Sequence, residues 1–260
     1  MSARLEPGLP GAEQPQGPAR GYRERIYSRY VSAFKGELPA AEQQAVLERH
    51  ARFFDYLFAP LLAAGRPRRA LEVGCGAGPF LHWAVTRGIP EVRGFDLSAE
   101  QVAAAERLGL PAEVASYRDA LPSQDGWDWI VALDLIEHLT RDEALELLDL
   151  CRAALAPGGT LILTTPNGAG LRPGPVAHGD LTHETIFTPQ TLTLALRLAG
   201  FGAVRVREIA PPPTGWRSRL RGLLWRGVRL AAMAVDLIET GSAGSRIYSR
   251  VMAVEARREG

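Results

Sequence analysis

A glycine-rich segment at residues 69–81 (RALEVGCGAGPFL) has the residue types and spacing most suited to chemistry. A short apolar strand pattern leads into three glycines, Gly74, Gly76 and Gly78, and an apolar helix pattern follows them. Glycines at a strand-to-helix turn adopt φ values that other residues avoid, and they let the backbone come close to a ligand. The segment therefore predicts a cofactor site at the carboxyl end of a strand.

Spacing and charge restrict the kind of cofactor. The dinucleotide fingerprint G-x-G-x-x-G would need a third glycine where this chain has Pro79. Glu72, two residues before the loop, would repel a pyrophosphate but would help to hold a cationic ligand. A nicotinamide-dependent oxidoreductase is therefore disfavoured.

The elements that position this loop alternate between strands and helices. Strand patterns are found at 69–73, 92–96, 112–115, 127–133, 160–165, 204–208 and 247–256. Helix patterns are found at 22–34, 39–64, 77–88, 98–108, 141–156, 189–199 and 216–238. Strands that alternate with helices of about ten residues or more predict an α/β fold with a parallel, doubly wound sheet.

Composition divides the chain into a central domain with additions. Residues 1–20 are rich in proline and glycine and have no signal-peptide pattern, so a disordered tail is expected. Residues 21–68 are expected to form an N-terminal helical lid, and 69–257 the catalytic domain. Within that domain, residues 210–245 form a basic, amphipathic helical insert between the last two strands.

Three motifs resemble the class I S-adenosylmethionine (SAM) dependent methyltransferases. They are LEVGCGAGPF at 71–80, WDWIVALDLIEHL at 127–139 and LAPGGTLILTTPN at 155–167. The second is similar to the branch that includes ubiquinone-biosynthesis O-methyltransferases and methyltransferases of sugars and natural products. The resemblance implies a Rossmann-like seven-stranded sheet of order 3-2-1-4-5-7-6, with the last strand antiparallel. It also implies SAM as the cofactor.

The resemblance assigns the cofactor contacts residue by residue. Asp96, at the end of the second strand, would bind the ribose hydroxyls; the alternative is a helix N-cap. The acid that the family carries after the third strand aligns with Ser116, because Asp119 comes three residues late. The full expected set is Glu72, Gly74, Cys75, Gly76, Gly78, Asp96, Leu97, Ser116, Tyr117 and Asp134.

Two histidines are candidates for a general base. His138 follows Glu137 after the fourth strand pattern, and His183 lies in the segment HGDLTHE at 178–184. A histidine has a pKa close to neutrality and can take a proton from a hydroxyl nucleophile. The alternative for His138 is a structural role. His178, Asp180, His183 and Glu184 make a metal site conceivable, but their spacing matches no known metal-ligand geometry, so none is expected. The alternative for His183 is substrate binding.

These expectations predict methyl transfer from SAM to a small-molecule or glycan-like acceptor, at a hydroxyl oxygen, by in-line displacement. Two alternatives remain open: an N- or C-methyltransferase of a natural-product pathway, and a SAM-binding partner protein without catalytic activity. SAM binding without turnover on any acceptor would distinguish the latter.

The formal charge of +1 conceals an uneven distribution: +4 over residues 1–69, −9 over 70–200 and +6 over 201–260. Cys75 and Cys151 form no disulfide or zinc pattern, and a cytoplasmic protein is expected. Nucleic-acid binding is disfavoured because the chain has one lysine and no recognisable module. The helix pattern at 216–238 leaves core packing, a homodimer contact, and contact with a membrane or lipid-linked substrate open.

Overall fold

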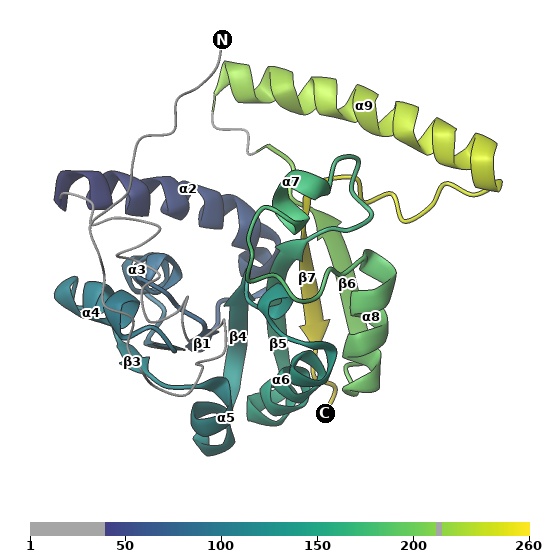
Figure 1. Ribbon diagram of the computed structural model, residues 1–260. Helices are drawn as coiled ribbons and strands as arrows, with labels where there is room; N and C mark the ends of the chain where they lie inside the picture. Colours follow the sequence, from purple (N-terminus) through teal and green to yellow (C-terminus); the bar gives the residue numbers. More distant parts are fainter. Residues whose placement is uncertain (1–39, 212–214) are drawn as a thin grey trace, which may run out of the picture.

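A seven-stranded sheet forms the centre of the protein, for which a computed structural model describes residues 40–211 and 215–260 (Figure 1). The strand order β3-β2-β1-β4-β5-β7-β6 is the one implied by the resemblance. The strands are β1 Arg69–Val73, β2 Glu91–Asp96, β3 Ala112–Val114, β4 Trp127–Leu133, β5 Leu155–Pro166, β6 Ala203–Glu208 and β7 Val251–Arg257.

Pairing directions agree with the doubly wound prediction. β1, β2, β3, β4 and β5 pair in parallel, whereas β7 runs antiparallel to both β5 and β6. The central strands β1 and β4 are buried along almost their whole length because helices cover both of their faces. The carboxyl ends of the parallel strands meet at one edge, where ligands bind in open α/β sheets.

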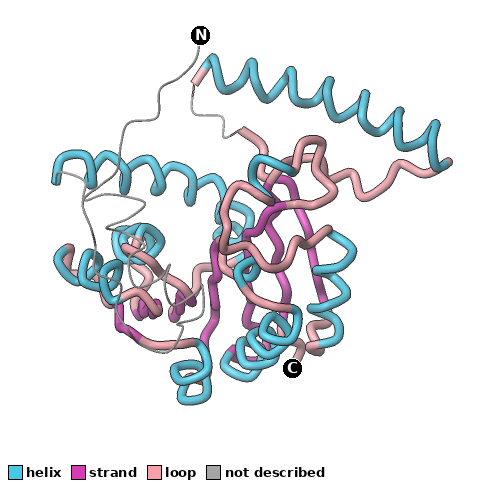
Figure 2. Tube along the Cα trace, in the orientation of Figure 1, coloured by secondary structure: helices cyan, strands magenta, loops and turns pink. Residues whose placement is uncertain are grey.

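Helices lie on both sides of the sheet (Figure 2). One apolar core lies among α2, α3 and α4, and a second lies among α5, α6 and α8. The helices are α2 Ala40–Ala64, α3 Pro79–Thr86, α4 Ala99–Arg107, α5 Tyr117–Ala120, α6 Arg141–Ala154, α7 Gly174–Ala177, α8 Pro189–Leu198 and α9 Trp216–Thr240, with short 3₁₀ helices η2 Leu121–Ser123 and η3 Ile136–His138. No helix in this described part is both long and apolar enough to span a bilayer.

The N-terminal additions are described only in part. The tail at 1–20 and the helix pattern at 22–34 lie outside the described residues. The expected helix at 39–64 is α2, and its second half is packed into the core. The Phe58 ring stacks on Trp83 of α3 at 4.8 Å between centroids and on Trp129 of β4 at 5.6 Å. This part of the expected lid therefore contributes to the core.

β5 begins five residues earlier than expected. A Gly-Gly pair is typical of a turn, but β5 runs through Gly158-Gly159, and its pairing with β4 shifts in register across them. Gly158 has φ 80°, and a Cβ at Gly159 would lie 2.7 Å from the carbonyl oxygen of Trp127. Glycines therefore allow an irregular section of strand here, in place of a turn.

Candidate functional site

The glycine loop joins β1 to α3 and is tied to the end of β2. Gly74, Gly76 and Gly78 have φ values of 74°, 52° and 80°, in the left-handed region that favours glycine. The amide of Gly74 donates to the carbonyl oxygen of Phe95 at 2.8 Å, and the amide of Gly76 donates to the Asp96 carboxylate at 2.9 Å. The loop and the second strand end thus form one unit.

The surroundings of Gly74, Gly76 and Gly78 explain why these positions carry no side chain. A Cβ at Gly78 would meet Leu110 at 2.6 Å, so this glycine allows α3 to pack closely on its neighbours. A Cβ at Gly76 would lie 3.0 Å from Oε1 of Gln101, and one at Gly74 would lie 3.0 Å from Leu135. At these two positions a side chain would fill the space beside the strand ends. The loop therefore fits a ligand that approaches the backbone closely.

Glu72 supplies a buried, unpaired carboxylate beneath the loop. Its side chain is 3 % exposed, and within the described residues its Oε2 has no hydrogen-bond partner. Burial raises the pKa of Glu72 well above its usual value, and the negative charge of Asp96 adds to the effect. An orphaned buried carboxyl group is satisfied by a ligand that brings hydrogen-bond donors or positive charge.

At the end of β2, the structure distinguishes the two roles expected for Asp96, a ribose contact and a helix N-cap. Ser98 is the N-cap of α4, because its side chain accepts from the amide of Gln101. The Asp96 carboxylate accepts from the amides of Ser98, at 2.8 Å, and Gly76. Leu97 is 60 % exposed beside it. The capping alternative for Asp96 is therefore wrong, and an exposed apolar side chain stands next to a carboxylate.

The segment after β3 differs from the expected arrangement. Ser116 is the N-cap of the short helix α5, and one helical turn brings the carboxylate of Asp119 to 2.6 Å from its hydroxyl. The carboxylate of Asp119 thus lies beside Ser116, the residue that aligns with the family's acid, although Asp119 comes three residues later in the sequence. The Tyr117 ring is buried in the core, and its hydroxyl donates to Glu146 at 3.1 Å. The side chain of Tyr117 therefore points away from the loop.

Cys75 belongs to the loop through its backbone only. Its thiol is 2 % exposed within the core between α2, α3 and α4, and burial raises its pKa. Its amide donates to the carbonyl oxygen of Phe95 at 3.0 Å. Its carbonyl oxygen accepts from the amide of Gly78 at 2.9 Å, so both backbone groups of Cys75 help to hold the loop in shape.

Asp134 marks the end of β4, next to the glycine loop. Its backbone has φ 49°, a left-handed conformation that few residues other than glycine adopt. The hydroxyl of Thr164 on β5 donates to its carboxylate at 2.9 Å, and the Asp134 amide donates to the Thr164 carbonyl oxygen at 3.0 Å. Strain of this kind is concentrated at functional sites in proteins. The neighbouring Thr164 was missed in the sequence because it looks like any polar strand residue.

Beyond Asp134 the chain brings together all three predicted catalytic residues. Glu137, His138 and His183 each offer one ligand atom, and these atoms lie within 4.8 Å of one another. The two imidazole rings meet edge to face, with centroids 4.8 Å apart. The amides of Glu184 and Thr185 donate to the carbonyl oxygen of Glu137 at 2.8 and 3.0 Å. These backbone bonds hold the loop that carries His183 against η3.

Hydrogen bonds fix the orientation of both imidazoles. The Thr182 hydroxyl donates to Asp180 at 2.6 Å, so Nδ1–H of His138 donates to that hydroxyl at 2.8 Å. Nδ1–H of His183 donates to the carbonyl oxygen of Ala177 at 2.9 Å. In the neutral form each ring keeps a lone pair on Nε2. Asp180 and Thr182 are therefore positioning residues, whereas His178 is exposed and makes no contribution to the cluster.

The environment of the cluster changes its charge. Burial raises the pKa of Glu137 to about 8, and the charge of Asp134 acts in the same direction. Burial lowers the pKa of His138, and neighbouring His183 lowers it further. Near pH 7 the neutral forms of the Glu137 carboxyl and the His138 imidazole are therefore favoured. Neutral histidine is the form that accepts a proton.

Replacing Glu137 by glutamine is expected to weaken the pH dependence of stability. The folded pKa of about 8 lies above the ordinary value of 4.5, so the folded state keeps a proton that the unfolded state releases between these values. The free energy of unfolding of the wild type therefore falls as pH rises from 4.5 to 8, by at most about 1.4 kcal/mol per pH unit from this group. Melting temperatures of the ligand-free protein from pH 5 to 9 measure the slope.

The control for this experiment is Glu106→Gln, which makes the same chemical change at an exposed site on α4. It is expected to keep the wild-type slope. If Glu137→Gln gives the same slope as the wild type, Glu137 is not held protonated in the folded protein.

The same cluster has the features of a cation site, which the sequence analysis did not expect. Oε2 of Glu137 is buried without a hydrogen-bond partner in the described chain, and both Nδ1 atoms are already bonded. One carboxylate and two imidazoles with bonded outer nitrogens are a common donor set for a divalent metal. Spacing within one segment could not indicate this donor set, because its members come from two segments about 45 residues apart, η3 and the loop before α8.

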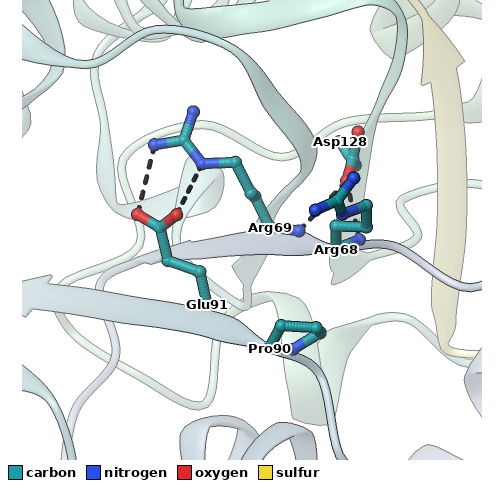
Figure 3. A pocket seen from close by; sticks show the side chains of 5 residues that line it. All are labelled: Arg68, Arg69, Pro90, Glu91 and Asp128. Carbon is teal, nitrogen blue, oxygen red and sulfur yellow. Dashed lines mark hydrogen bonds and ion pairs between the residues drawn. The ribbon is translucent and has the colours of Figure 1, made fainter.

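A hollow at the opposite edge of the sheet is not a rival site. It is lined by Arg68, Arg69, Pro90, Glu91 and Asp128 (Figure 3). Arg69 pairs with Glu91 at 2.8 Å, and the Asp128 carboxylate accepts from the amides of Arg68 and Arg69 at 2.7 and 3.0 Å. The two acids that line this hollow are thus already bonded to its arginines and to the backbone of β1, and the hollow lies at the amino ends of the strands.

Known proteins resemble the chain over most of its length. A family model of the methyltransferase domain matches residues 41–206. A ubiquinone biosynthesis O-methyltransferase from Xanthomonas campestris pv. campestris (strain B100) is 29 % identical over 185 residues, which cover 64 % of this chain and 74 % of the relative. The enzyme of the same name from Xylella fastidiosa (strain M23) is 27 % identical over 237 residues, covering 84 % and 94 %.

A solved structure shares the fold. The crystal structure of a SAM-dependent methyltransferase from Archaeoglobus fulgidus superposes with a TM-score of 0.58 at 19 % identity. The match covers 90 % of this chain and 99 % of that protein. The sheet order and the position of the glycine loop therefore belong to a known architecture.

Proposed function

This chain belongs to the methyltransferase domain family and is a class I SAM-dependent enzyme, and from that premise we propose that it methylates a hydroxyl oxygen of a small-molecule acceptor. The observation that carries the proposal is the cluster of Glu137, His138 and His183, which lies at the strand end next to the glycine loop. An acceptor hydroxyl placed between loop and cluster would have a proton acceptor on one side and the cofactor on the other.

Residues of the carboxyl edge fit the cofactor. In the proposed site the backbone of Gly74 and Gly76 lies against SAM. The side chain of Glu72 accepts a hydrogen bond from the positively charged part of SAM or attracts it by its charge. The Asp96 carboxylate binds the ribose hydroxyls. Leu97 lies against the adenine, and Asp119, held beside Ser116, accepts from its amino group. Bound SAM supplies an electrophilic methyl group on a sulfonium. Asp134 borders the gap between the cofactor and the acceptor.

The histidines remove the proton from the acceptor. Methyl transfer to a hydroxyl releases one proton, and Nε2 of His138 or His183 takes it while Nδ1–H stays bonded to Thr182 or Ala177. The lowered pKa of His138 keeps its imidazole neutral and ready to accept. Fixed rings also contribute by orientation, because an in-line displacement depends on the alignment of nucleophile and methyl group.

A second role for the cluster is a cation site that binds the acceptor oxygen. The buried Glu137 side chain favours this role, because its Oε2 has no hydrogen-bond partner among the described residues and a cation that displaces the carboxyl proton would satisfy it. A divalent cation on Glu137, His138 and His183 would lower the pKa of a coordinated hydroxyl, so that no histidine base would be needed.

The relatives and the cluster support the proposed acceptor class. The relatives carry a name that places oxygen methylation in ubiquinone biosynthesis, and a proton-accepting cluster suits a hydroxyl nucleophile. We therefore place a hydroxylated small molecule first and a glycan-like acceptor second. A non-catalytic SAM-binding protein would have no use for two imidazoles held in fixed orientations at this edge.

Methyl-labelled SAM is expected to mark one hydroxyl-bearing compound when the purified protein is added to a small-molecule extract of the source cells. Mass spectrometry should find the labelled product with a methyl ether, and calorimetry should show binding of both SAM and its demethylated product. A labelled amine or carbon would overturn oxygen as the target. Binding without any labelled product would favour the non-catalytic alternative, and no binding at high micromolar SAM would contradict the cofactor site.

A further inference from the structure

The face of helix α9 that is turned toward the rest of the protein mixes polar and apolar residues, including the buried Ala232, whereas the largest group of apolar side chains faces solvent. Ser218, Trp225, Arg229, Met233 and Asp236 are only partly exposed. These positions follow one another at helical spacing and form the face directed at the domain. The predicted helix at 216–238 is therefore correct, but its apolar stripe does not pack on the core.

Specific polar contacts fix this orientation. Arg229 pairs with Glu208 at the end of β6 at 2.9 Å, and the same carboxylate accepts from the amide of Tyr248 at 2.6 Å. The Tyr248 hydroxyl in turn donates to Asp236 at 2.6 Å. These bonds join the second half of α9 to the segments before and after the helix. The outward direction of the opposite face follows from them.

The outer face is a long apolar surface. Leu223 and Leu224 are 62 % and 61 % exposed, and Ile238 reaches 85 %. The exposed apolar residues of α9 are Trp216, Leu220, Leu223, Leu224, Val228, Leu230, Val235, Leu237 and Ile238. Contiguous apolar surface of this kind marks an interaction site in soluble proteins.

Arginines border the apolar face. Arg217, Arg219, Arg221 and Arg226 are exposed, and no acidic residue occurs between Glu208 and Asp236. The outer surface of the first four turns of α9 is thus apolar in the middle and positively charged at its margins. This combination is typical of helices that lie in the interface of an anionic membrane.

The helix lies at the same edge of the sheet as the proposed active site. It follows the carboxyl end of β6 and leads into β7, whose first residue, Val251, pairs with Pro166 at the carboxyl end of β5. Figure 1 shows α9 standing clear of the sheet on the side of α7. Leu171 and Leu181, in the loop that carries His183, are 44 % and 83 % exposed. Apolar side chains of the site loop are thus found at this edge as well.

We propose that α9 lies with its apolar face in the surface of an anionic lipid bilayer. The geometry favours a bilayer over a second copy of the chain, because two copies of α9 face to face would bring eight exposed arginines into one interface. In a bilayer the same arginines reach the anionic headgroups while the leucines enter the acyl boundary. The carboxyl edge of the sheet then faces the membrane.

Vesicle flotation of the full chain tests the proposal. The wild type should float with vesicles that contain about one third phosphatidylglycerol in phosphatidylcholine, and about ten-fold less with pure phosphatidylcholine. The double variant Leu223→Glu/Leu224→Glu should lose at least about ten-fold in partition on the anionic vesicles. The matched control Leu194→Glu/Leu198→Glu alters two exposed leucines of α8 and should bind like the wild type.

The charged margin is tested separately. Arg219→Gln/Arg226→Gln should bind anionic vesicles about ten-fold less well, whereas Arg141→Gln/Arg197→Gln, which removes two exposed arginines on other helices, should not. The proposal is overturned if the wild type does not float, or if the α9 variants bind as well as the wild type. A lipid-free dimer that the leucine variants convert to a monomer, measured by analytical ultracentrifugation, would instead assign the face to a second copy.

Discussion

Replacing Gly76 by valine is expected to abolish SAM binding, with a loss of affinity of about 100-fold or more in calorimetry. The added side chain would occupy the space beside the loop, where a Cβ would already lie 3.0 Å from Gln101. The φ of 52° is also unfavourable for a β-branched residue, so the loop would be strained or displaced. Displacement would break the bond between the Gly76 amide and Asp96, so the loop and the expected ribose contact would be lost together.

A matched control separates backbone strain from lost ligand space. Gly88 has φ 74° at the end of α3, and a Cβ there meets nothing within 4 Å. Gly88→Val should therefore carry a similar conformational cost while it keeps the wild-type affinity for SAM. Circular dichroism would show that both variants are folded. Tight SAM binding by a folded Gly76→Val protein would contradict the assignment of the loop.

The parallel part of the fold could be predicted because its signals are local. β1 and β4 begin and end where the sequence indicates, since each is a short apolar run bounded by polar residues or glycine. The start of β5 could not be found in this way. A Gly-Gly pair usually indicates a turn, and only bonds between segments distant in the sequence, to β4 and to Arg258 after β7, show that the strand passes through it.

The orientation of α9 shows the limit of periodicity. An amphipathic pattern predicts a helix and an apolar face, but the usual inference that this face packs on the core is wrong here. The deciding contacts, Arg229 with Glu208 and Asp236 with Tyr248, join segments 21 and 12 residues apart through side chains. Neither pair has a pattern that a sequence alone reveals.

The candidate site could be predicted where it depends on strand ends. Glu137 and His138 follow β4 directly, so their position at the carboxyl edge follows from the topology. The approach of His183 could not be derived, because it depends on the backbone bonds from Glu184 and Thr185 to the Glu137 carbonyl oxygen. The contact between Asp119 and Ser116 was not visible for a similar reason: a separation of three residues is short when the chain turns as a helix.

Replacing the histidines one at a time is expected to separate base from positioning group. His138→Ala and His183→Ala should both keep the wild-type affinity for SAM, because neither ring lies in the glycine loop. The variant that lacks the base should lose about 10²- to 10⁴-fold in kcat and its dependence on pH in the acid range. If His138 is the base, the wild-type rate should rise with pH through a midpoint below 6.5, because the pKa of this imidazole is lowered from that value.

The control is His178→Ala, since His178 lies in the same loop but is exposed and outside the cluster. It should leave kcat unchanged. A chelator tests the alternative in which a bound cation activates the acceptor. In that case chelation should remove activity and a divalent metal should restore it. Both cluster variants should also bind that metal more weakly than the wild type. Full activity after chelation, with a large loss in one histidine variant, assigns proton transfer to that imidazole. Unchanged rates in both variants would remove the cluster from the reaction, because Nε2 of either ring is the atom on which both mechanisms depend.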